Sequence, residues 1–441
     1  MRDLSARLRE IVRNDRLDPG RRNSPAASRP SGSTVSFSAD GHDGIDVRRA
    51  AEALGGTLHQ SGASTCIVID RAWEADHWHG RGRVSSFAPN AQAPIGLFDP
   101  RVTKTPDWAR RPVFFDIETT GLSGGAGTLP FLVGCGWFED DGRFQVRQFF
   151  LAGPAGEHAL LQALAAIFAD ASLLVTFNGR TFDVPLMETR WAFHRCACPT
   201  DDLPHFDMLP PARRLWGRRE SDDASCRLAA LERTVLRFHR VGDVPGIEIP
   251  ARYFHFLRTG DVDAIEGVLE HNRHDLISLA AIASRALWLA HEGADAATDP
   301  GEQFALGRLY ERAGDIARAA YAYELASRPT AGPVRAPALG RLALLHRREA
   351  RYDAAAAAWQ GVIDVAGEHQ GRATLEGLER QAAEALAIHH EHRARDLDTA
   401  KRYAQSLRGR TSGRAAADLD HRLGRLNRKI RAREDTLKWD E

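Results

Sequence analysis

Acidic residues that could bind metal ions occur at three separate points of this sequence. Asp116 and Glu118 lie at the end of the apolar run VFFDIE, and Asp183 ends the segment FNGRTFD. The helical segment HNRHD carries His271 and Asp275. Residues two apart on a strand share a face, and so do residues four apart on a helix. Carboxylates that lie side by side repel each other unless a cation joins them, so this pattern favours a hard metal ion such as Mg²⁺ or Mn²⁺.

Each of the three positions also has an ordinary structural interpretation. Asp116 and Glu118 are compatible with solvated acids at the end of a strand. Asp183 is compatible with the N-cap of a helix. The pair His271 and Asp275 is compatible with a local ion pair on a helix surface. The occurrence of all three in one chain favours metal binding over three unrelated structural roles.

The surrounding sequence predicts an α/β domain that positions these residues. Strand-like runs at 113–118, 131–138 and 144–151 are joined by Gly-rich or Asp-Gly turns, which predicts an antiparallel meander. The order helix, strand, helix over 157–194 indicates a crossover that adds a parallel strand. Further helices are predicted at 226–236, 250–258 and 262–291.

The three acidic segments also carry a family resemblance. DIETTGL, FNGRTFD and HNRHD resemble, in this order, the exonuclease motifs of the DEDD (DnaQ-like) ribonuclease H-like superfamily, over residues 111–290. The chain most resembles the bacterial YprB-like predicted exonucleases, which pair such a domain with tetratricopeptide-like repeats, and VPGIEIPARYFHFLRTGD is also similar to that family. The resemblance implies an α/β ribonuclease H-like domain, a mixed sheet flanked by helices, followed by an all-α repeat domain.

The same resemblance implies a metal-binding role for the acidic residues. Asp116, Glu118, Asp183 and Asp275 would bind two Mg²⁺ or Mn²⁺ ions, with Asp116 bridging both, and His271 would act as the general base. Two such ions can activate a water and stabilise the leaving 3′ oxygen of a phosphodiester. The predicted base departs from the common patterns of the superfamily, in which either a tyrosine or a histidine precedes the last aspartate, each at its own spacing. His271 is a histidine, but its spacing to Asp275 is the one that the tyrosine has.

Residues near these motifs are expected to contact the substrate or to support the site. The resemblance implies that the terminal nucleotide is bound by Thr119, Thr120, Gly121, Leu122 and Asn178. Asp207 is expected to support the structure of the site. Arg180, Arg190 and Arg273 either guide phosphates or are solvated surface arginines.

A group of histidines and cysteines offers a competing metal site. Zinc could in principle be bound by His194, Cys196, Cys198, His205 and Cys226. However, the C-x-C spacing is not that of the usual zinc knuckle, so structural zinc is not expected.

The chain divides into segments of different composition. We expect a flexible N-terminal segment at 1–46, a small α/β lead-in at 47–110 and the exonuclease domain at 111–292. Tetratricopeptide-like repeats are expected at 300–410, followed by a basic C-terminal helix at 411–441, which is either solvated or binds RNA.

The repeats are predicted from small and large residues that recur at matching offsets. Gly314, Ala319 and Tyr323 have counterparts 36 residues later, and a weaker third copy through Ala400 and Ala404 follows after 45 more. Because these offsets are irregular, the repeats are degenerate, and an irregular helical bundle remains the alternative.

Composition limits the function classes. The chain has 59 Lys+Arg and 59 Asp+Glu, so any contact with nucleic acid must be local. Five irregularly placed cysteines favour a reducing compartment, and the sequence lacks a secretory signal core and a long apolar run. We therefore expect a soluble cytoplasmic protein without a membrane partner.

Two functions of different class follow from the sequence. The first is a metal-dependent 3′-to-5′ exonuclease that acts on the 3′ end of DNA or RNA, expected to be single-stranded, with a protein partner bound through the repeats. The second is a non-catalytic adaptor that binds nucleic acid or protein through a degenerate nuclease domain. Because no carboxylate of the set is missing, the exonuclease is favoured. No motif chooses between DNA and RNA.

Overall fold

The computed structural model describes residues 45–441 except 106, 122–126, 218–225, 369–372 and 438–441. The predicted flexible segment therefore lies outside the described residues, apart from its last two positions.

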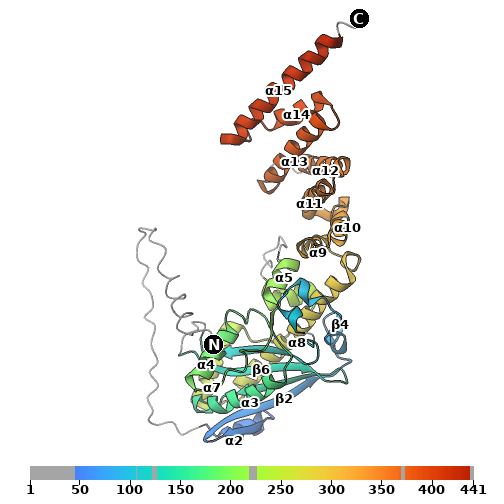
Figure 1. Ribbon diagram of the computed structural model, residues 1–441. Helices are drawn as coiled ribbons and strands as arrows, with labels where there is room; N and C mark the ends of the chain where they lie inside the picture. The colour runs from blue at the N-terminus through green and yellow to red at the C-terminus, as the bar shows by residue number, and fades with distance from the viewer. Residues whose placement is uncertain (1–44, 106, 122–126, 218–225, 369–372, 438–441) are drawn as a thin grey trace, which may run out of the picture. The chain divides into compact units, whose positions relative to one another are not determined.

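A mixed sheet forms the centre of the N-terminal part (Figure 1). Within the described residues, this sheet has seven strands in the order β1-β2-β7-β6-β5-β8-β9. Strands β5, β6 and β7 pair antiparallel, as predicted, and β8 and β9 continue the sheet in parallel with β5. The bounds are β1 (Thr57–Ser61), β2 (Ser64–Trp73), β5 (Pro112–Thr119), β6 (Pro130–Phe138), β7 (Phe144–Phe150), β8 (Leu173–Thr176) and β9 (His205–Asp207). A separate small hairpin consists of β3 (Trp78–His79) and β4 (Gly82–Arg83).

The first two strands belong to this same sheet. Strand β2 pairs with β7 along its length, from Ile67 opposite Phe150 to Trp73 opposite Phe144. The predicted lead-in thus adds two strands, β1 and β2, to the sheet that contains β5. Its strands share one hydrophobic core with β5, β6 and β7.

Helices cover both faces of the sheet. Alternation along β5 sends neighbouring side chains to opposite faces. Phe115 packs on Phe168 of α3, with ring centroids 5.4 Å apart, whereas Asp116 faces Asn272 of α8. The helices of this part are α2 (Val47–Ala53), α3 (Glu157–Asp170), α4 (Asp183–Phe193), α5 (Leu209–Trp216), α6 (Leu228–Leu231), α7 (Ile249–Thr259) and α8 (Asp263–Glu292).

Helix α8 lies unusually close to strand β6. A Cβ atom on Gly134 would lie 2.2 Å from the side-chain oxygen of Asn272, so only glycine permits this approach. Buried Gln148 of β7 donates hydrogen bonds to Leu269 O and to Asn272 Oδ1, each at 2.8 Å. These contacts fix the position of α8 over the sheet.

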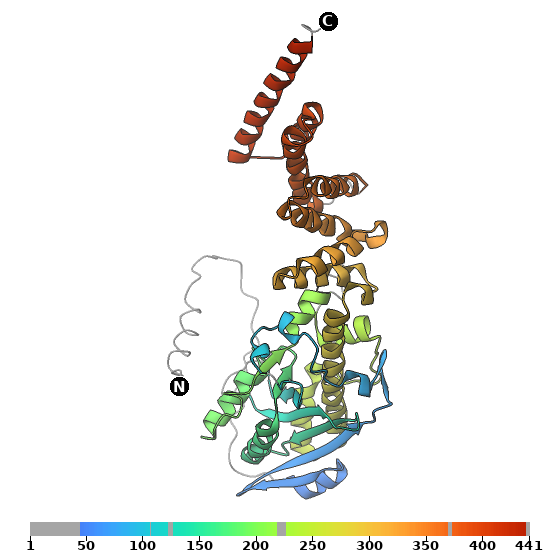
Figure 2. The same ribbon diagram turned by 45° about the vertical axis from the view of Figure 1, so that its right-hand side comes forward.

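After α8 the described chain is entirely helical, which confirms the predicted all-α region (Figure 2). Helix pairs turn at Gly314, Ala350 and Arg395, and each of these residues has a positive φ, of 83°, 59° and 56°. The turns therefore occur at the same 36- and 45-residue offsets that the sequence shows. The helices are α9 (Pro300–Ala313), α10 (Ile316–Ala326), α11 (Arg335–Arg348), α12 (Tyr352–Glu368), α13 (Ala373–His392), α14 (Leu397–Ser406) and α15 (Gly413–Leu437).

The first of these helix pairs packs directly on the α/β domain. Trp216 of α5 donates to buried Glu302 of α9 at 2.8 Å, and Tyr310 donates to Ala290 O of α8 at 3.0 Å. Phe304 and Leu306 belong to the same hydrophobic core as the C-terminal half of α8. None of the helices within the described ranges is both long and apolar enough to cross a lipid bilayer.

Candidate metal centre

Strand β5 and helix α8 bring acidic residues and a histidine together. His271 Nε2 lies 3.9 Å from Glu118 Oε1 and 3.5 Å from Asp275 Oδ2. One ligand atom from each of these three residues falls within 4.8 Å of the others. Among the described residues, this is the one group of three or more histidine, cysteine or acidic side chains with that arrangement.

Two further carboxylates lie beside this group. Asp116 precedes Glu118 by two residues on β5, and Asp183 is the first residue of α4, where only 8% of it is exposed. Burial, followed by repulsion from Asp275, raises the pKa of Asp116 and that of Glu118 well above their ordinary values, and Asp183 contributes to both shifts. Asp116 and Glu118 therefore each lie within electrostatic reach of both Asp183 and Asp275.

The pKa of Asp183 shows how unfavourable these negative charges are without a cation. Burial, with a smaller contribution from the charge of Asp207, raises it to about 7. Oxygen donors whose charges are buried and mutually repulsive gain free energy from a divalent cation, so the side chains present fit Mg²⁺ or Mn²⁺.

One carboxylate is held in place by α8. Asn272 Nδ2 donates to Asp116 Oδ2 at 2.9 Å, while its own oxygen accepts from Gln148. Asn272 is fully buried and one residue beyond His271, so the same helical turn fixes Asp116 and carries the histidine.

His271 is oriented by a residue from a distant loop. Asp243 Oδ1 lies 2.8 Å from His271 Nδ1. Because a carboxylate only accepts, Nδ1 carries the proton, and the neutral ring then has its free lone pair on Nε2. Arg240 Nη1 also lies 3.4 Å from Nδ1, but the shorter contact with Asp243 decides the tautomer. The proton-accepting nitrogen of His271 thus faces Glu118 and Asp275.

A buried arginine is the second residue that the motifs did not indicate. Arg240 pairs with Asp275 Oδ1, and with Glu232 Oε1 at 2.5 Å. Burial by itself would lower the pKa of Arg240, but the charges of Asp275 and Glu232 outweigh burial and raise it. The two carboxylate oxygens of Asp275 therefore have different partners: Oδ1 pairs with Arg240, and Oδ2 faces His271.

The sequence offers little signal for these two residues. Arg240 and Asp243 lie in the loop RVGD, which resembles an ordinary charged surface turn. The segment VPGIEIPARYFHFLRTGD, which is similar to the family, begins at Val244, one residue later. Only the fold shows that this loop reaches α8.

The predicted nucleotide-binding residues lie near the site, but their side chains make structural hydrogen bonds. The Thr119 hydroxyl donates to Gly121 O at 2.9 Å, and the Thr120 hydroxyl accepts from Leu129 N at 3.0 Å. Asn178 has a positive φ of 68° and its Oδ1 accepts from Thr181 at 2.9 Å. Leu122 lies outside the described residues.

Asp207 supports the loop that precedes Asp183, in agreement with its expected role. Its carboxylate accepts hydrogen bonds from the backbone amides of Asn178 at 2.8 Å and Arg180 at 3.1 Å. This arrangement fixes the sharp exit from β8 and the start of α4.

The three arginines suggested as phosphate contacts are all engaged with acidic side chains. The expectation is wrong for Arg190, which is only 6% exposed and bonds Glu157 at 2.5 Å inside the core. Arg180 pairs with Asp99 at 3.2 Å, and Arg273 pairs with Glu270 at 3.0 Å while its guanidinium lies over the Trp73 ring.

The five residues of the competing zinc site have other contacts. His194 bonds Glu157 at 2.7 Å, and His205 bonds Thr176 at 2.8 Å. Within the described part of the chain, no three of the five bring ligand atoms within 4.8 Å of each other.

Comparison with known proteins assigns the chain to a family. Residues 113–287, which contain the four carboxylates and His271, match the RNase_H superfamily. The chain is 32% identical over 320 residues to a protein of Bacillus subtilis (strain 168) named "Uncharacterized protein YprB", covering 72% of this chain and 74% of that protein. The chain therefore belongs to the same family as YprB of Bacillus subtilis and carries a domain of the RNase_H superfamily.

Proposed function

We propose that this protein is a metal-dependent 3′-to-5′ exonuclease that hydrolyses phosphodiester bonds at the 3′ end of single-stranded nucleic acid. The observation that carries the proposal is the electrostatic convergence of Asp116, Glu118, Asp183 and Asp275 in a domain of the RNase_H superfamily. A domain that only binds a partner has no need for four mutually repelling, partly buried carboxylates.

These carboxylates would hold two Mg²⁺ or Mn²⁺ ions, which, when bound, promote ionisation of the attacking water and stabilise charge on the leaving 3′ oxygen. Asn272 would keep Asp116 in one orientation. Arg240 would hold Asp275 so that Oδ2 remains directed at the site.

His271 would be the general base. Its Nε2 atom faces Glu118 and Asp275 and would accept the proton of the attacking water, while Asp243 keeps the other proton on Nδ1. Since Asp243 reaches the ring from outside the carboxylate group, the base can be oriented without using a metal ligand.

The terminal nucleotide would bind beside this site, at Thr119–Gly121, Leu122 and Asn178. Because the hydroxyls of Thr119 and Thr120 already hold the turn, recognition there would rely on backbone groups and shape, which carry no base identity. The helices that follow would be tetratricopeptide-like repeats, in the domain layout that the sequence predicts, and they would bind a protein partner.

The test uses the purified full chain with 5′-labelled single-stranded DNA and RNA, in Mg²⁺, Mn²⁺ or chelator. We expect a metal-dependent ladder that shortens from the 3′ end, and no products from a circular DNA, which has no end. Asp116→Asn is nearly isosteric and should abolish cleavage while the protein stays folded. Cleavage of the circle, or equal cleavage by Asp116→Asn, would contradict the proposal.

One observation favours a second function, that of a non-catalytic adaptor. The guanidinium of Arg240 already neutralises part of the charge of Asp275, as a metal ion would. In that case a titration of the wild-type protein with Mn²⁺ in a calorimeter would show no binding up to millimolar concentration. Binding that Asp116→Asn weakens would favour the exonuclease instead.

A further inference from the structure

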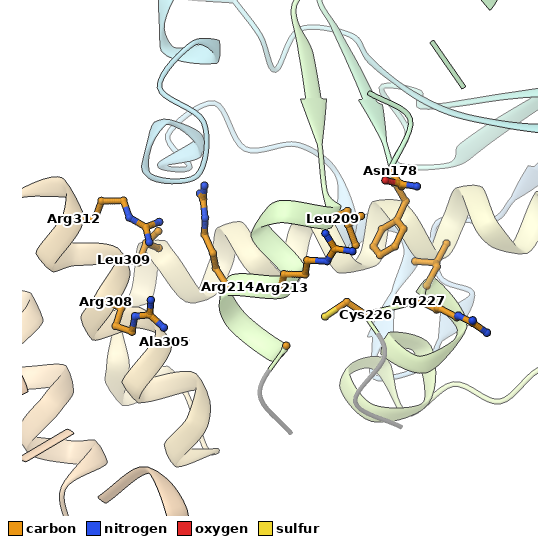
Figure 3. Close-up of a pocket in the computed structure, with 13 residues that line it drawn as sticks. Asn178, Leu209, Arg213, Arg214, Cys226, Arg227, Ala305, Arg308, Leu309 and Arg312 are labelled. Atoms are coloured by element: carbon orange, nitrogen blue, oxygen red, sulfur yellow. The ribbon is translucent and has the colours of Figure 1, made fainter. Parts of the chain in front are cut away.

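A large cavity lined by arginines lies between α5 and α9. Its volume is about 930 Å³, and its walls carry Arg213, Arg214, Arg227, Arg308 and Arg312. In Figure 3, Arg308 and Arg312 extend from α9 toward α5, which carries Arg213 and Arg214. None of the 13 described residues that line the cavity is acidic.

The cavity is connected to the candidate metal centre through the chain itself. Phe177 and Asn178 line one wall, and they lie in the loop that leads from β8 to Asp183. Asp207 holds this loop in place through the amide of Asn178. The cavity therefore begins where a strand that leaves the metal centre on this side would continue.

The opposite walls are held at a fixed separation. Trp216, at the end of α5, donates to Glu302 of α9 at 2.8 Å, and both side chains are buried. Consequently, a buried hydrogen bond ties together the two helices that carry Arg213, Arg214, Arg308 and Arg312.

Two arginines of the cavity, Arg214 and Arg312, repel each other, although the charge of Asp99 acts on Arg214 in the opposite direction. Burial, followed by the positive charge of Arg312, lowers the pKa of Arg214, whose Nη1 donates to Phe98 O at 2.7 Å. A polyanion inside the cavity would relieve this repulsion. Planar guanidinium groups bind phosphate oxygens in pairs, and the ring of Phe177 offers a surface on which a base could stack.

We propose that this arginine cavity binds the phosphodiester backbone of the substrate strand, on the 5′ side of the nucleotide being cleaved. The inference rests on the proposed function. A nucleic acid is favoured over an acidic protein because the cavity shares the Asn178 loop with the metal centre and combines arginines with an aromatic wall. The first helix of the C-terminal region would thus complete the binding site of the nuclease domain.

The test compares the double variant Arg213→Gln/Arg312→Gln with a matched control, Arg48→Gln/Arg49→Gln. The four arginines are all exposed, and those of the control lie on α2. Binding of a fluorescent single-stranded 20-mer is measured in chelator at several salt concentrations. The logarithm of the binding constant falls linearly with the logarithm of the salt concentration, and each phosphate contact contributes about 0.7 to the magnitude of this salt slope. The salt slope of the cavity variant should therefore be smaller by about 1.4, and the variant should bind roughly tenfold more weakly at low salt. The control should match the wild type.

A second pair of measurements keeps the inference separate from the proposed function. Arg213→Lys/Arg312→Lys retains both charges and should keep most of the slope. Hydrolysis of the p-nitrophenyl ester of thymidine 5′-monophosphate requires no upstream strand, so the glutamine variant should retain it.

The outcomes divide clearly. An unchanged slope in a glutamine variant that still hydrolyses the ester would overturn the cavity proposal and leave the exonuclease intact. Equal loss of binding to DNA and to poly-glutamate would also overturn it, in favour of an acidic protein partner. If the wild type hydrolyses neither ester nor oligonucleotide but shows the expected slope difference, the exonuclease proposal fails, and of the cavity proposal only the binding of single-stranded nucleic acid stands.

Discussion

At the residue scale, the contact between Asp243 and His271 makes a prediction about the chemical step. Asp243→Asn replaces a pure acceptor with an amide, which no longer fixes the proton on Nδ1. We expect kcat for oligonucleotide cleavage to fall roughly 10–100-fold, the range for residues that orient a functional group, with KM nearly unchanged.

Metal affinity distinguishes this positioning role from a general distortion of the site. Mn²⁺ binding should be the same in wild type and Asp243→Asn, and Asp243→Glu should recover part of kcat. A parallel loss of Mn²⁺ affinity and kcat would mean that Asp243 supports the carboxylates rather than the base.

The raised pKa of Asp183 predicts how the stability of the metal-free protein depends on pH. Its folded pKa of about 7 exceeds the ordinary value of 3.8, so between these values the native state binds more protons than the unfolded state. The free energy of unfolding therefore falls as pH rises through 7. The side chain of the Asp183→Asn variant carries no charge, so the variant does not lose stability in this way. Above pH 7 its free energy of unfolding should exceed that of the wild type by an amount on the order of a few kcal/mol.

Thermal unfolding in chelator checks this prediction. The variant should melt at a higher temperature than wild type at pH 8, and the difference should shrink toward pH 5. Mn²⁺ should raise the melting temperature of wild type more than that of the variant. Asp353→Asn, which removes a fully exposed carboxylate, should show neither effect. If Asp183→Asn melts lower than wild type at pH 8 in chelator, the carboxylate is stabilising and the electrostatic argument is wrong.

The sequence indicated the four carboxylates because each lies in a short segment with its own local pattern, such as two acids on one strand face. It did not indicate Arg240 or Asp243, because their partners lie about 30 residues away in sequence and their loop has no regular period. It also suggested Arg190 as a surface residue, since the charge of an arginine does not reveal the buried Glu157 that pairs with it.

At the element scale, the separation of α8 from β6 decides whether the two halves of the site meet. A Cβ on Gly134 would lie 2.2 Å from Asn272 Oδ1, so Gly134→Ala must push α8 away from the strand or break the bonds of Asn272. We expect a loss of about 1–3 kcal/mol in the free energy of unfolding, typical of overpacking, and a larger relative loss of cleavage.

Urea unfolding and oligonucleotide cleavage measure the two effects. Gly246→Ala is the control, because nothing lies within 4 Å of a Cβ at that glycine. Wild-type cleavage by a folded Gly134→Ala protein would show that the site tolerates movement of α8.

The strands were predictable from alternation and turn residues, and the long helix from its apolar period. The path around residues 226–236 was not, although a helix was expected there. Helix α6 ends at Leu231, and a π-turn over Glu232–Leu236 follows. This change of pitch accompanies the buried pair of Glu232 with Arg240, a long-range contact that overrides local helix preference.

At the scale of the whole molecule, the sequence separated an α/β part from a helical part by strand-like runs in the first and by recurring small and large residues in the second. It could not show that the two share a core, because packing between α8 and α9 leaves no periodic signal. The arginine cavity also leaves no signal in the sequence, because its two walls come from segments that are about 100 residues apart.

This shared core predicts where the chain can be shortened. Four apolar side chains of α9 are almost completely buried: Phe304, Leu306, Leu309 and Tyr310. At about 1.5–3 kcal/mol for each buried large side chain, their removal costs about 6–12 kcal/mol, comparable to the whole stability of a domain. A chain that ends after residue 298 should therefore aggregate or unfold at 25 °C.

A chain that ends after Arg328 retains α9 and α10 and should fold, with hydrolysis of the nucleotide ester close to that of the full protein. Circular dichroism and size-exclusion chromatography compare the two truncations. Because the longer one also keeps both walls of the arginine cavity, it should retain the salt slope of single-strand binding. A folded chain ending at 298 with full ester hydrolysis would show instead that the first helix pair is an independent module, and that its buried contacts with α8 do not stabilise the nuclease domain.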